Sequence, residues 1–398
     1  DWEQRKLSEI TDKVTEKNAG LQYVETFTNS AEFGIISQRD FFDHDIAKLG
    51  SLDGYYIVKN EDFVYNPRIS TSAPVGPINR NKLGRTGVMS PLYTVFRLHD
   101  IDTTYLEYFF KCGYWHSFMN FNGDSGARSD RFSIRDNVFF QMPIPIPDID
   151  EQRKIGELLT CLDNLIALHQ RKFEKLTNVK KSMLEKMFPQ NGSCYPAVRF
   201  KGFTDPWEQR KLGELVDRVV RKNINNESTL PLTISAQYGL VDQITYFNNR
   251  VASRDVSNYY LVLNGEFAYN KSTSDGYPFG AVKRLDLYEK GVLSTLYIVF
   301  APKKEQQINS NFLTVFFDTD RWHKGVAERA AEGARNHGLL NISAEDFFDI
   351  DLSVPKDIVE QKQIGAFIRQ LDNLITLHQR ELEKLQSIKK ALLEKMFV

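Results

Sequence analysis

The chain has 398 residues, of which 41% are hydrophobic and 26% charged, and its formal net charge is −1. This length predicts two or three domains with their own cores, and the composition is that of an ordinary globular protein. The widely spaced Cys112, Cys161 and Cys194 favour neither a disulfide framework nor a zinc site, no apolar run reaches the length of a membrane span, and a cytoplasmic location is expected.

The opening residues return in the middle of the chain. DWEQRKLSEI at 1–10 reappears as PWEQRKLGEL at 206–215. In the second place the motif is preceded by YPAVRFKGFTD at 195–205, which has no counterpart ahead of the first, so we expect the natural protein to start before residue 1.

Short framework segments also recur at a nearly constant offset. SAEFGI at 30–35 matches SAQYGL at 235–240, and FVYN at 63–66 matches FAYN at 267–270. Aromatic and β-branched residues in segments such as YYIV, FVYN and LYTVF, separated by Gly, Pro and Asn, predict short strands. Residues 104–120 and 311–330 are expected to be helices, so the fold class is α+β.

The loops between these segments differ between the halves and carry the candidate ligand-binding residues. Residues 66–85 hold four basic side chains and no acid. Arg, Lys, Asn and Ser suit phosphate contacts and hydrogen bonds to base edges, although a solvated surface loop is the alternative. The candidates for DNA contact are Arg68, Ser70, Arg80, Lys82, Arg85, Arg128 and Arg131 in the first half, and Lys271, Ser272, Lys283, Arg284, Arg335, Asn336 and His337 in the second.

Two long segments are copies of each other. Residues 151–188 and 360–397 match at 23 of 38 positions, with apolar residues stepping by three and four and no internal proline. Each predicts a helix of roughly 50 Å. Because such a helix is unstable alone, we expect the copies to pair as an antiparallel coiled coil, the alternative being that each packs on its own domain. The predicted core of the pair is Leu162, Leu165, His169, Leu176, Leu371, Leu374, His378 and Leu385.

His169 and His378 hold the same place in the two copies. A metal or catalytic role is one interpretation, but a single polar residue midway along a coiled coil more often fixes the register. Antiparallel pairing predicts that they are buried neighbours.

The sequence shows no catalytic motif. Asn66-Pro67 begins like an adenine methyltransferase signature, but Arg68 breaks it, and neither a phosphate-binding loop nor a His-Glu-x-x-His motif occurs. We therefore expect no active site, metal or cofactor in this chain.

Taken together, the doubled features resemble a known family. WEQRKLGEL after RFKGFTDPW, GAR at 126–128 and 333–335, a proline-bearing strand leading to EQ, and long helices ending in LEKMF are similar to the specificity subunit of a type I restriction-modification enzyme. The resemblance implies two target recognition domains at 1–147 and 207–356, conserved helices at 148–190 and 357–398, and a linker at 191–206.

The resemblance further implies a non-catalytic DNA-binding subunit that reads a split, asymmetric target. It implies two methyltransferase subunits and restriction subunits as partners, with S-adenosylmethionine, ATP and Mg bound by those partners. Helices of this length predict a spacer of roughly five to eight base pairs between half-sites about one DNA turn apart. The rival hypotheses are a coiled-coil scaffold that binds only proteins and a self-contained DNA-modifying enzyme.

Overall fold

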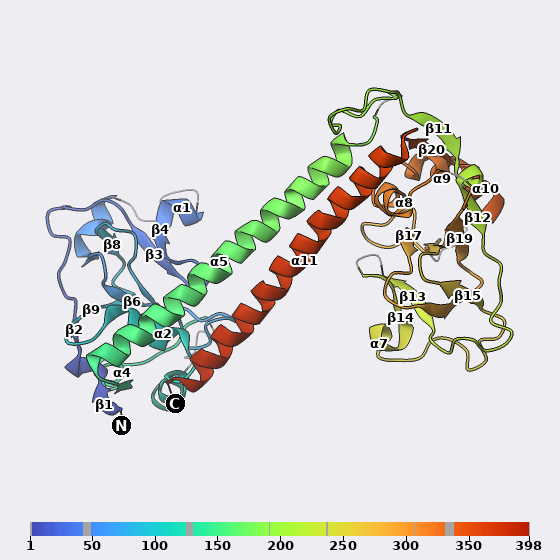
Figure 1. Cartoon of the computed structure of the whole chain (residues 1–398). Helices are drawn as coiled ribbons and strands as arrows, with labels where there is room; N and C mark the ends of the chain where they lie inside the picture. Colours follow the sequence, from blue (N-terminus) through green and yellow to red (C-terminus); the bar gives the residue numbers. More distant parts are fainter. Residues whose placement is uncertain are drawn as a thin grey trace. The chain divides into compact units, whose positions relative to one another are not determined.

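The computed structural model describes residues 2–42, 49–124, 130–190, 192–235, 238–305, 307–330 and 338–397. The chain divides into two compact units, one made of residues 1–170 and 380–398 and the other of residues 171–379. Two long helices, α5 (Ile149–Lys186) and α11 (Ile358–Lys395), each contribute one part to either unit (Figure 1). The predicted helices are therefore present as single uninterrupted elements.

The first unit is α+β. Its strands are β1 (Glu3–Lys6), β2 (Thr11–Lys13), β3 (Phe27–Ser30), β4 (Gly34–Ser37), β5 (Tyr56–Val58), β6 (Phe63–Tyr65), β7 (Ile78–Arg80), β8 (Gly87–Met89), β9 (Thr94–Leu98) and β10 (Pro143–Ile146). Its helices before α5 are the short 3₁₀ turns η1 (Leu7–Glu9) and η2 (Leu49–Gly54), and α1 (Gln38–Phe42), α2 (Thr103–Lys111), α3 (His116–Asn122) and α4 (Asp136–Phe139).

The second unit repeats this order of strands. Its strands are β11 (Glu208–Lys211), β12 (Val216–Arg218), β13 (Leu232–Ser235), β14 (Gly239–Asp242), β15 (Tyr260–Leu263), β16 (Phe267–Asn270), β17 (Ala281–Arg284), β18 (Lys290–Leu293), β19 (Ile298–Pro302) and β20 (Asp351–Val354). Its helices before α11 are α6 (Leu212–Leu215), α7 (Gln243–Phe247), α8 (Ser310–Phe317), α9 (His323–Arg329) and α10 (Ala344–Phe348).

Both units are built on the same antiparallel sheet. The strand order is β2-β9-β6-β7 in the first unit and β12-β19-β16-β17 in the second. The register agrees as well, because Phe63 lies opposite Phe96 and Phe267 opposite Phe300, and all four rings are fully buried. A buried aromatic pair at the sheet centre holds the same frame in both halves despite their different loops.

The helices predicted over 104–120 and 311–330 are each broken into two, so these predictions were wrong in extent. The breaks lie between α2 and α3 and between α8 and α9. Trp115 and Trp322, both 2% exposed, donate their indole N–H to the carbonyls of Phe110 and Phe317. At both breaks, a buried indole is thus hydrogen-bonded to the end of the preceding helix.

The two long helices pack antiparallel. In the first unit Asp163 of α5 forms an ion pair with Lys389 of α11, and in the second unit Lys180 of α5 pairs with Asp372 of α11 at 2.6 Å. Asp163 and Asp372 are the same residue of the repeated sequence, and so are Lys180 and Lys389, since both pairs are 209 residues apart. One ion pair therefore occurs twice, once in each unit.

The predicted core of the helix pair is correct in part. Leu162 and Leu371 are buried, while Leu176 and Leu385 are half-buried. Leu165 and Leu374 were wrongly placed in the core: they are 38% and 44% exposed. Ile166 and Ile375, the next residues along, are half-buried instead. A pair of helices buries only a narrow stripe, so a one-residue error moves a side chain to the outer face.

His169 and His378 are each half-buried, so the expectation that both are buried was wrong. Their role in fixing the register stays a prediction.

The chain just after each long helix anchors it in a globular core. Phe188, after α5, packs among Trp207, Phe312 and Phe316 in the second unit. Phe397, after α11, is fully buried in the first unit beside Tyr105. The repeated LEKMF motif thus ends in an aromatic anchor for either unit.

Candidate nucleic-acid interface

Two loops of the first unit that are distant in sequence lie side by side. The backbone N–H of Ile69 donates to the carbonyl of Asp130, and that of Phe132 donates to the carbonyl of Pro67. These bonds place Arg68 directly opposite Arg131 in a short antiparallel bridge. We call residues 66–76 and 130–133 the first loop pair.

The second unit forms the corresponding arrangement, the second loop pair, from residues 270–280 and 338–342. Here the N–H of Leu340 donates to the carbonyl of Lys271, and Ser272 lies opposite Leu339. Counting from the shared FVYN and FAYN segments, Ser272 holds the place of Arg68 and Leu339 that of Arg131.

Each loop pair is held by the same polar contacts from the sheet. The phenol of Tyr65 donates to the carbonyl of Val75 at 2.9 Å, and Tyr269 donates to the carbonyl of Phe279 at 2.9 Å. Burial raises the pKa of both phenols, which therefore stay protonated and able to donate. A tyrosine on strand β6 or β16 thus holds the returning end of the loop that follows that strand.

An asparagine and a glycine complete the frame. The side-chain oxygen of Asn66 accepts the N–H of Arg68 at 3.0 Å, as Asn270 does for Ser272. Gly76 and Gly280 have φ of +84° and +76°, and a Cβ on either would lie 2.1 Å from the carbonyl oxygen of Asn66 or Asn270. Only glycine fits these two positions.

The residues predicted to contact DNA fall into two groups: those on the loop pairs, and those whose side chains are largely buried and form ion pairs with acidic residues. Arg68, Ser70 and Ser272 are exposed on the loop pairs, and Arg131 and Lys271 are half-buried. No acidic side chain in the described ranges forms an ion pair with Arg68 or Arg131. The role of these five residues in DNA contact stays a prediction.

Three of the predicted contact residues have acid partners within the chain, and their role in DNA contact stays a prediction. Arg80 pairs with Glu107 at 2.7 Å, Lys283 with Asp318 at 2.8 Å, and Arg284 with Asp286 at 2.7 Å. Their side chains are only 10%, 18% and 8% exposed. Sequence alone could not separate Arg80 and Lys283 from the loop residues, because their acid partners lie in distant segments, whereas the partner of Arg284 is only two residues away.

The remaining candidates for DNA contact cannot be assigned to either of these two groups. Lys82 and Arg85 are 59% and 48% exposed but contact Glu107 and Glu25, so a role in DNA contact stays a prediction for them. Arg128, Arg335, Asn336 and His337 lie outside the described residues.

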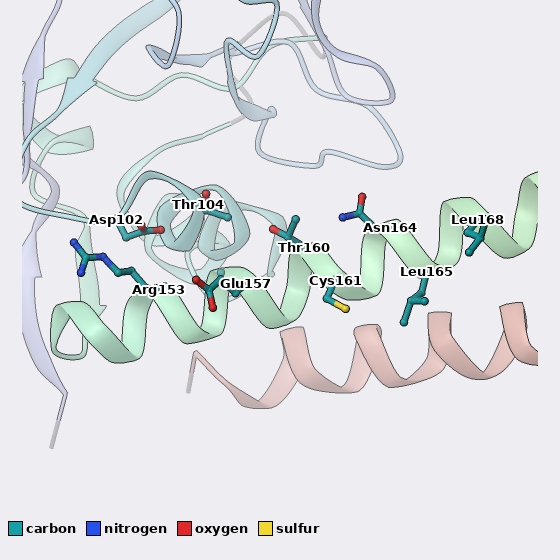
Figure 2. A pocket seen from close by; sticks show the side chains of 10 residues that line it. Asp102, Thr104, Arg153, Glu157, Thr160, Cys161, Asn164, Leu165 and Leu168 are labelled. Atoms are coloured by element: carbon teal, nitrogen blue, oxygen red, sulfur yellow. The ribbon is translucent and has the colours of Figure 1, made fainter.

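The outer face of α5 in the first unit bounds an open cavity of about 620 Å³ (Figure 2). Asp102 and Thr104, at the start of α2, approach α5 at Gly156, where a Cβ would lie 3.2 Å from Thr104. Along this face Leu165 and Leu168 are 38% and 39% exposed. Their copies on α11 in the second unit, Leu374 and Leu377, are 44% and 51% exposed. An exposed leucine pair thus recurs on both helices.

Other site types find no support in the described part of the chain. It holds no group of three or more His, Cys, Asp or Glu side chains placed to bind a metal. None of its helices is long and apolar enough to cross a membrane.

Comparisons with known proteins agree with this architecture. The family model for the type I restriction modification DNA specificity domain matches residues 1–178 and 204–387. The MjaVIII specificity subunit of a type I restriction enzyme from Methanocaldococcus jannaschii is 24% identical over 274 residues, covering 64% of this chain and 61% of that protein. The putative MjaX specificity subunit of the same organism is 22% identical over 295 residues, covering 66% of this chain and 60% of that protein.

This chain thus spans about 60% of the length of these two relatives. A solved structure, the S subunit of a type I restriction-modification system from M. genitalium, aligns with all of this chain and 96% of that one, with a TM-score of 0.58 and 13% identity. At this identity the likeness concerns the fold.

Proposed function

Because this chain belongs to the family of type I restriction-modification DNA specificity domains, which match both of its halves, we propose that it is the DNA-reading subunit of such a complex. It reads a bipartite, asymmetric target in double-stranded DNA, one half-site with each loop pair. It docks two methyltransferase subunits and, through them, the restriction subunits. S-adenosylmethionine, ATP and Mg belong to those partners, and no catalytic step is assigned to this chain.

One observation carries the proposal for DNA reading: the two units share one frame but present different side chains on it. Tyr65, Asn66 and Gly76 make the same contacts as Tyr269, Asn270 and Gly280. Exposed polar side chains on such a frame suit base edges, and different side chains suit different bases. A scaffold that binds only proteins would have no use for two equally built loops of unlike chemistry.

Partner docking is supported by exposed leucines that occur at the same places on both long helices. Leu165 and Leu168 recur as Leu374 and Leu377, exposed in both units. Two equivalent apolar faces on a doubled chain fit two copies of one partner. The partner we propose for them is a helix of the methyltransferase subunit.

DNA binding by the full chain tests the first half of the proposal. The chain, with its co-expressed modification subunits, is incubated with duplexes in which either half-site is scrambled, at two salt concentrations. Scrambling one half-site is expected to weaken binding by a factor of ten or more, and raising the salt to weaken all binding, because phosphate contacts release counterions. Equal binding to every duplex would mean a protein scaffold without sequence reading.

Co-purification tests the second half. Leu165→Glu with Leu168→Glu should abolish capture of one methyltransferase subunit, and Leu374→Glu with Leu377→Glu capture of the other. Leu296→Glu is the matched control, since Leu296 is 66% exposed on the loop between β18 and β19 of the second unit. Full retention of both partners by the quadruple variant would remove this face from the docking surface.

A further inference from the structure

Two positions have the same backbone pairing in both loop pairs but carry side chains of different chemistry. Arg68 faces Arg131 in the first unit, and Ser272 faces Leu339 in the second. We propose that Arg68 and Arg131 read guanine in the first half-site, whereas Ser272 and Leu339 read an A·T pair at the equivalent place of the second. This inference rests on the proposed function and states what each loop pair recognises.

The arginine pair has a physical cost that points to a ligand. Side chains directly opposite in an antiparallel pair lie about 4.5 to 5.5 Å apart, and like charges in this place destabilise the fold. No acid in the described ranges forms an ion pair with either guanidinium, whereas Arg80 and Arg85 in the same region each have a carboxylate partner. A ligand that offers negative charge or acceptors at this place would offset the repulsion between the two arginines.

Guanine supplies such acceptors in a form that matches arginine. Its N7 and O6 lie side by side on the major-groove edge and accept two N–H groups from one guanidinium. Arg68 is exposed and Arg131 half-buried, so both can reach a ligand laid across the bridge. The main competitor for an arginine is a phosphate.

At the position of Arg131, the comparison of the two units decides between base and phosphate, and Arg68 is assigned to the same guanine by its place directly opposite Arg131. The phosphate backbone is the same in both half-sites, so a position that contacts phosphate needs a donor or a positive charge in both units. Leu339 can provide neither from its side chain, and it is 53% exposed. A position that is arginine in one unit and leucine in the other faces something that differs between half-sites, and in DNA that is the bases.

The second loop pair offers a hydroxyl and an apolar side chain at these places. Ser272 is exposed, with its backbone fixed by Asn270. An exposed leucine suits the C5-methyl group of thymine, and a hydroxyl can donate to or accept from an adjacent base edge. Neither side chain can supply the bidentate donor that distinguishes guanine.

Selection from randomised duplex DNA tests the proposal on the unaltered protein. The full chain with its modification subunits should select a first half-site containing guanine. Replacing that guanine by 7-deazaguanine, which lacks N7, should weaken binding about 5- to 150-fold, the factor for 1 to 3 kcal/mol. Replacing thymine by uracil at the second half-site should weaken binding, whereas 7-deazaguanine in the spacer should not.

Substitutions assign the effect to residues. Arg68→Ser and Arg131→Leu, which place the second unit's side chains on the first frame, should remove the preference for guanine and leave the second half-site unchanged. Arg5→Ser is the control for loss of one positive charge, because Arg5 lies in the same unit but pairs with Glu9. Its base preference should equal that of the unaltered chain.

Three outcomes would overturn the proposal. A first half-site without guanine, or no response to 7-deazaguanine, refutes it while leaving the proposed function intact. An equal loss of affinity for all sequences in Arg68→Ser would show phosphate contact instead. Absence of any sequence preference in the unaltered complex would refute the proposed function as well.

Discussion

Asp163 on α5 forms an ion pair with Lys389 on α11, and the repeat makes this the same contact as that between Asp372 and Lys180. The carboxylate of Asp163 also accepts the phenol O–H of Tyr108 at 2.8 Å. Burial alone would raise the pKa of Asp163, but the contacts with Lys389 and Tyr108 offset it and keep the pKa below its ordinary value. Both copies of a charged pair thus support one helix register.

Replacing Asp163 alone should weaken the contact between the helices, and replacing Lys389 as well should restore it. Asp163→Lys places two ammonium groups together, and adding Lys389→Asp recreates the attraction with its direction inverted. Because the side chains are 35% and 22% exposed, we expect a coupling of about 1 kcal/mol at most in a double-mutant cycle. Thermal unfolding would detect this as a shift of about 2 to 4 °C. Lys390→Asp, at a 78% exposed position on the same helix, is the control; zero coupling would contradict the role of the pair.

Substituting the loop glycines should affect one half-site each. In Gly76→Ala the new Cβ would lie 2.1 Å from the carbonyl of Asn66, so the first loop pair must move, and Gly280→Ala should do the same in the second. Binding to DNA should fall tenfold or more at the corresponding half-site alone. Gly84→Ala is the matched control: its φ is +70°, but no atom lies within 4 Å, so it should cost about 1 kcal/mol of stability with no change in recognition. Loss at both half-sites would argue against separate recognition loops.

Arg199 and Glu360 form a buried ion pair in the second unit. Two guanidinium nitrogens donate to the carboxylate at 2.7 and 2.8 Å, and Glu360 is 1% exposed. Arg199→Ala leaves that carboxylate buried with little compensation, and we expect a loss of about 3 to 5 kcal/mol in the unfolding free energy of the second unit. Urea unfolding measures it.

The copy of Glu360 provides the control for that measurement. Glu151 holds the same place in the first unit and is exposed. Glu151→Gln should therefore change stability by no more than about 0.5 kcal/mol. Similar losses in Arg199→Ala and Glu151→Gln would mean that burial of the pair is not what matters.

The stability of the first unit should depend on the protonation of Glu107. Burial raises the pKa of Glu107, but Lys111, Arg80 and Lys82 together lower it below its ordinary value of 4.5. A lowered pKa in the folded state means that the stabilisation is present above pH 4.5 and is lost as the pH falls through the folded pKa.

The variant Glu107→Gln isolates this contribution. It should be less stable than the unaltered chain at pH 7, and the difference should shrink as the pH is lowered below 4.5. Unfolding curves at a series of pH values measure the difference. A difference that stays constant with pH would show that the ionised carboxylate is not the source.

The sequence by itself determined the doubled architecture. A repeat of 38 positions with an apolar period near 3.5 can only form two like helices, and the echoes at 63–66 and 267–270 can only form the same strand twice. The sequence also predicted Arg68 and Ser272 as candidates for DNA contact, because Arg and Ser in loops that differ between the halves suit phosphates and base edges.

The tertiary structure decided what periodicity leaves open. Leu165 and Ile166 are adjacent apolar residues, and either one fits the heptad pattern. Only the packing of the helices determined that Ile166 is half-buried and Leu165 exposed. The pairing of Asp163 with Lys389, 226 residues away, depends on how the helices meet. Arg80 forms an ion pair with Glu107, whereas Arg68 forms none among the described residues, because the acids that neutralise charge come from distant segments. Sequence gives the type and order of side chains, whereas long-range neighbours determine which charges are satisfied internally and which remain for a ligand.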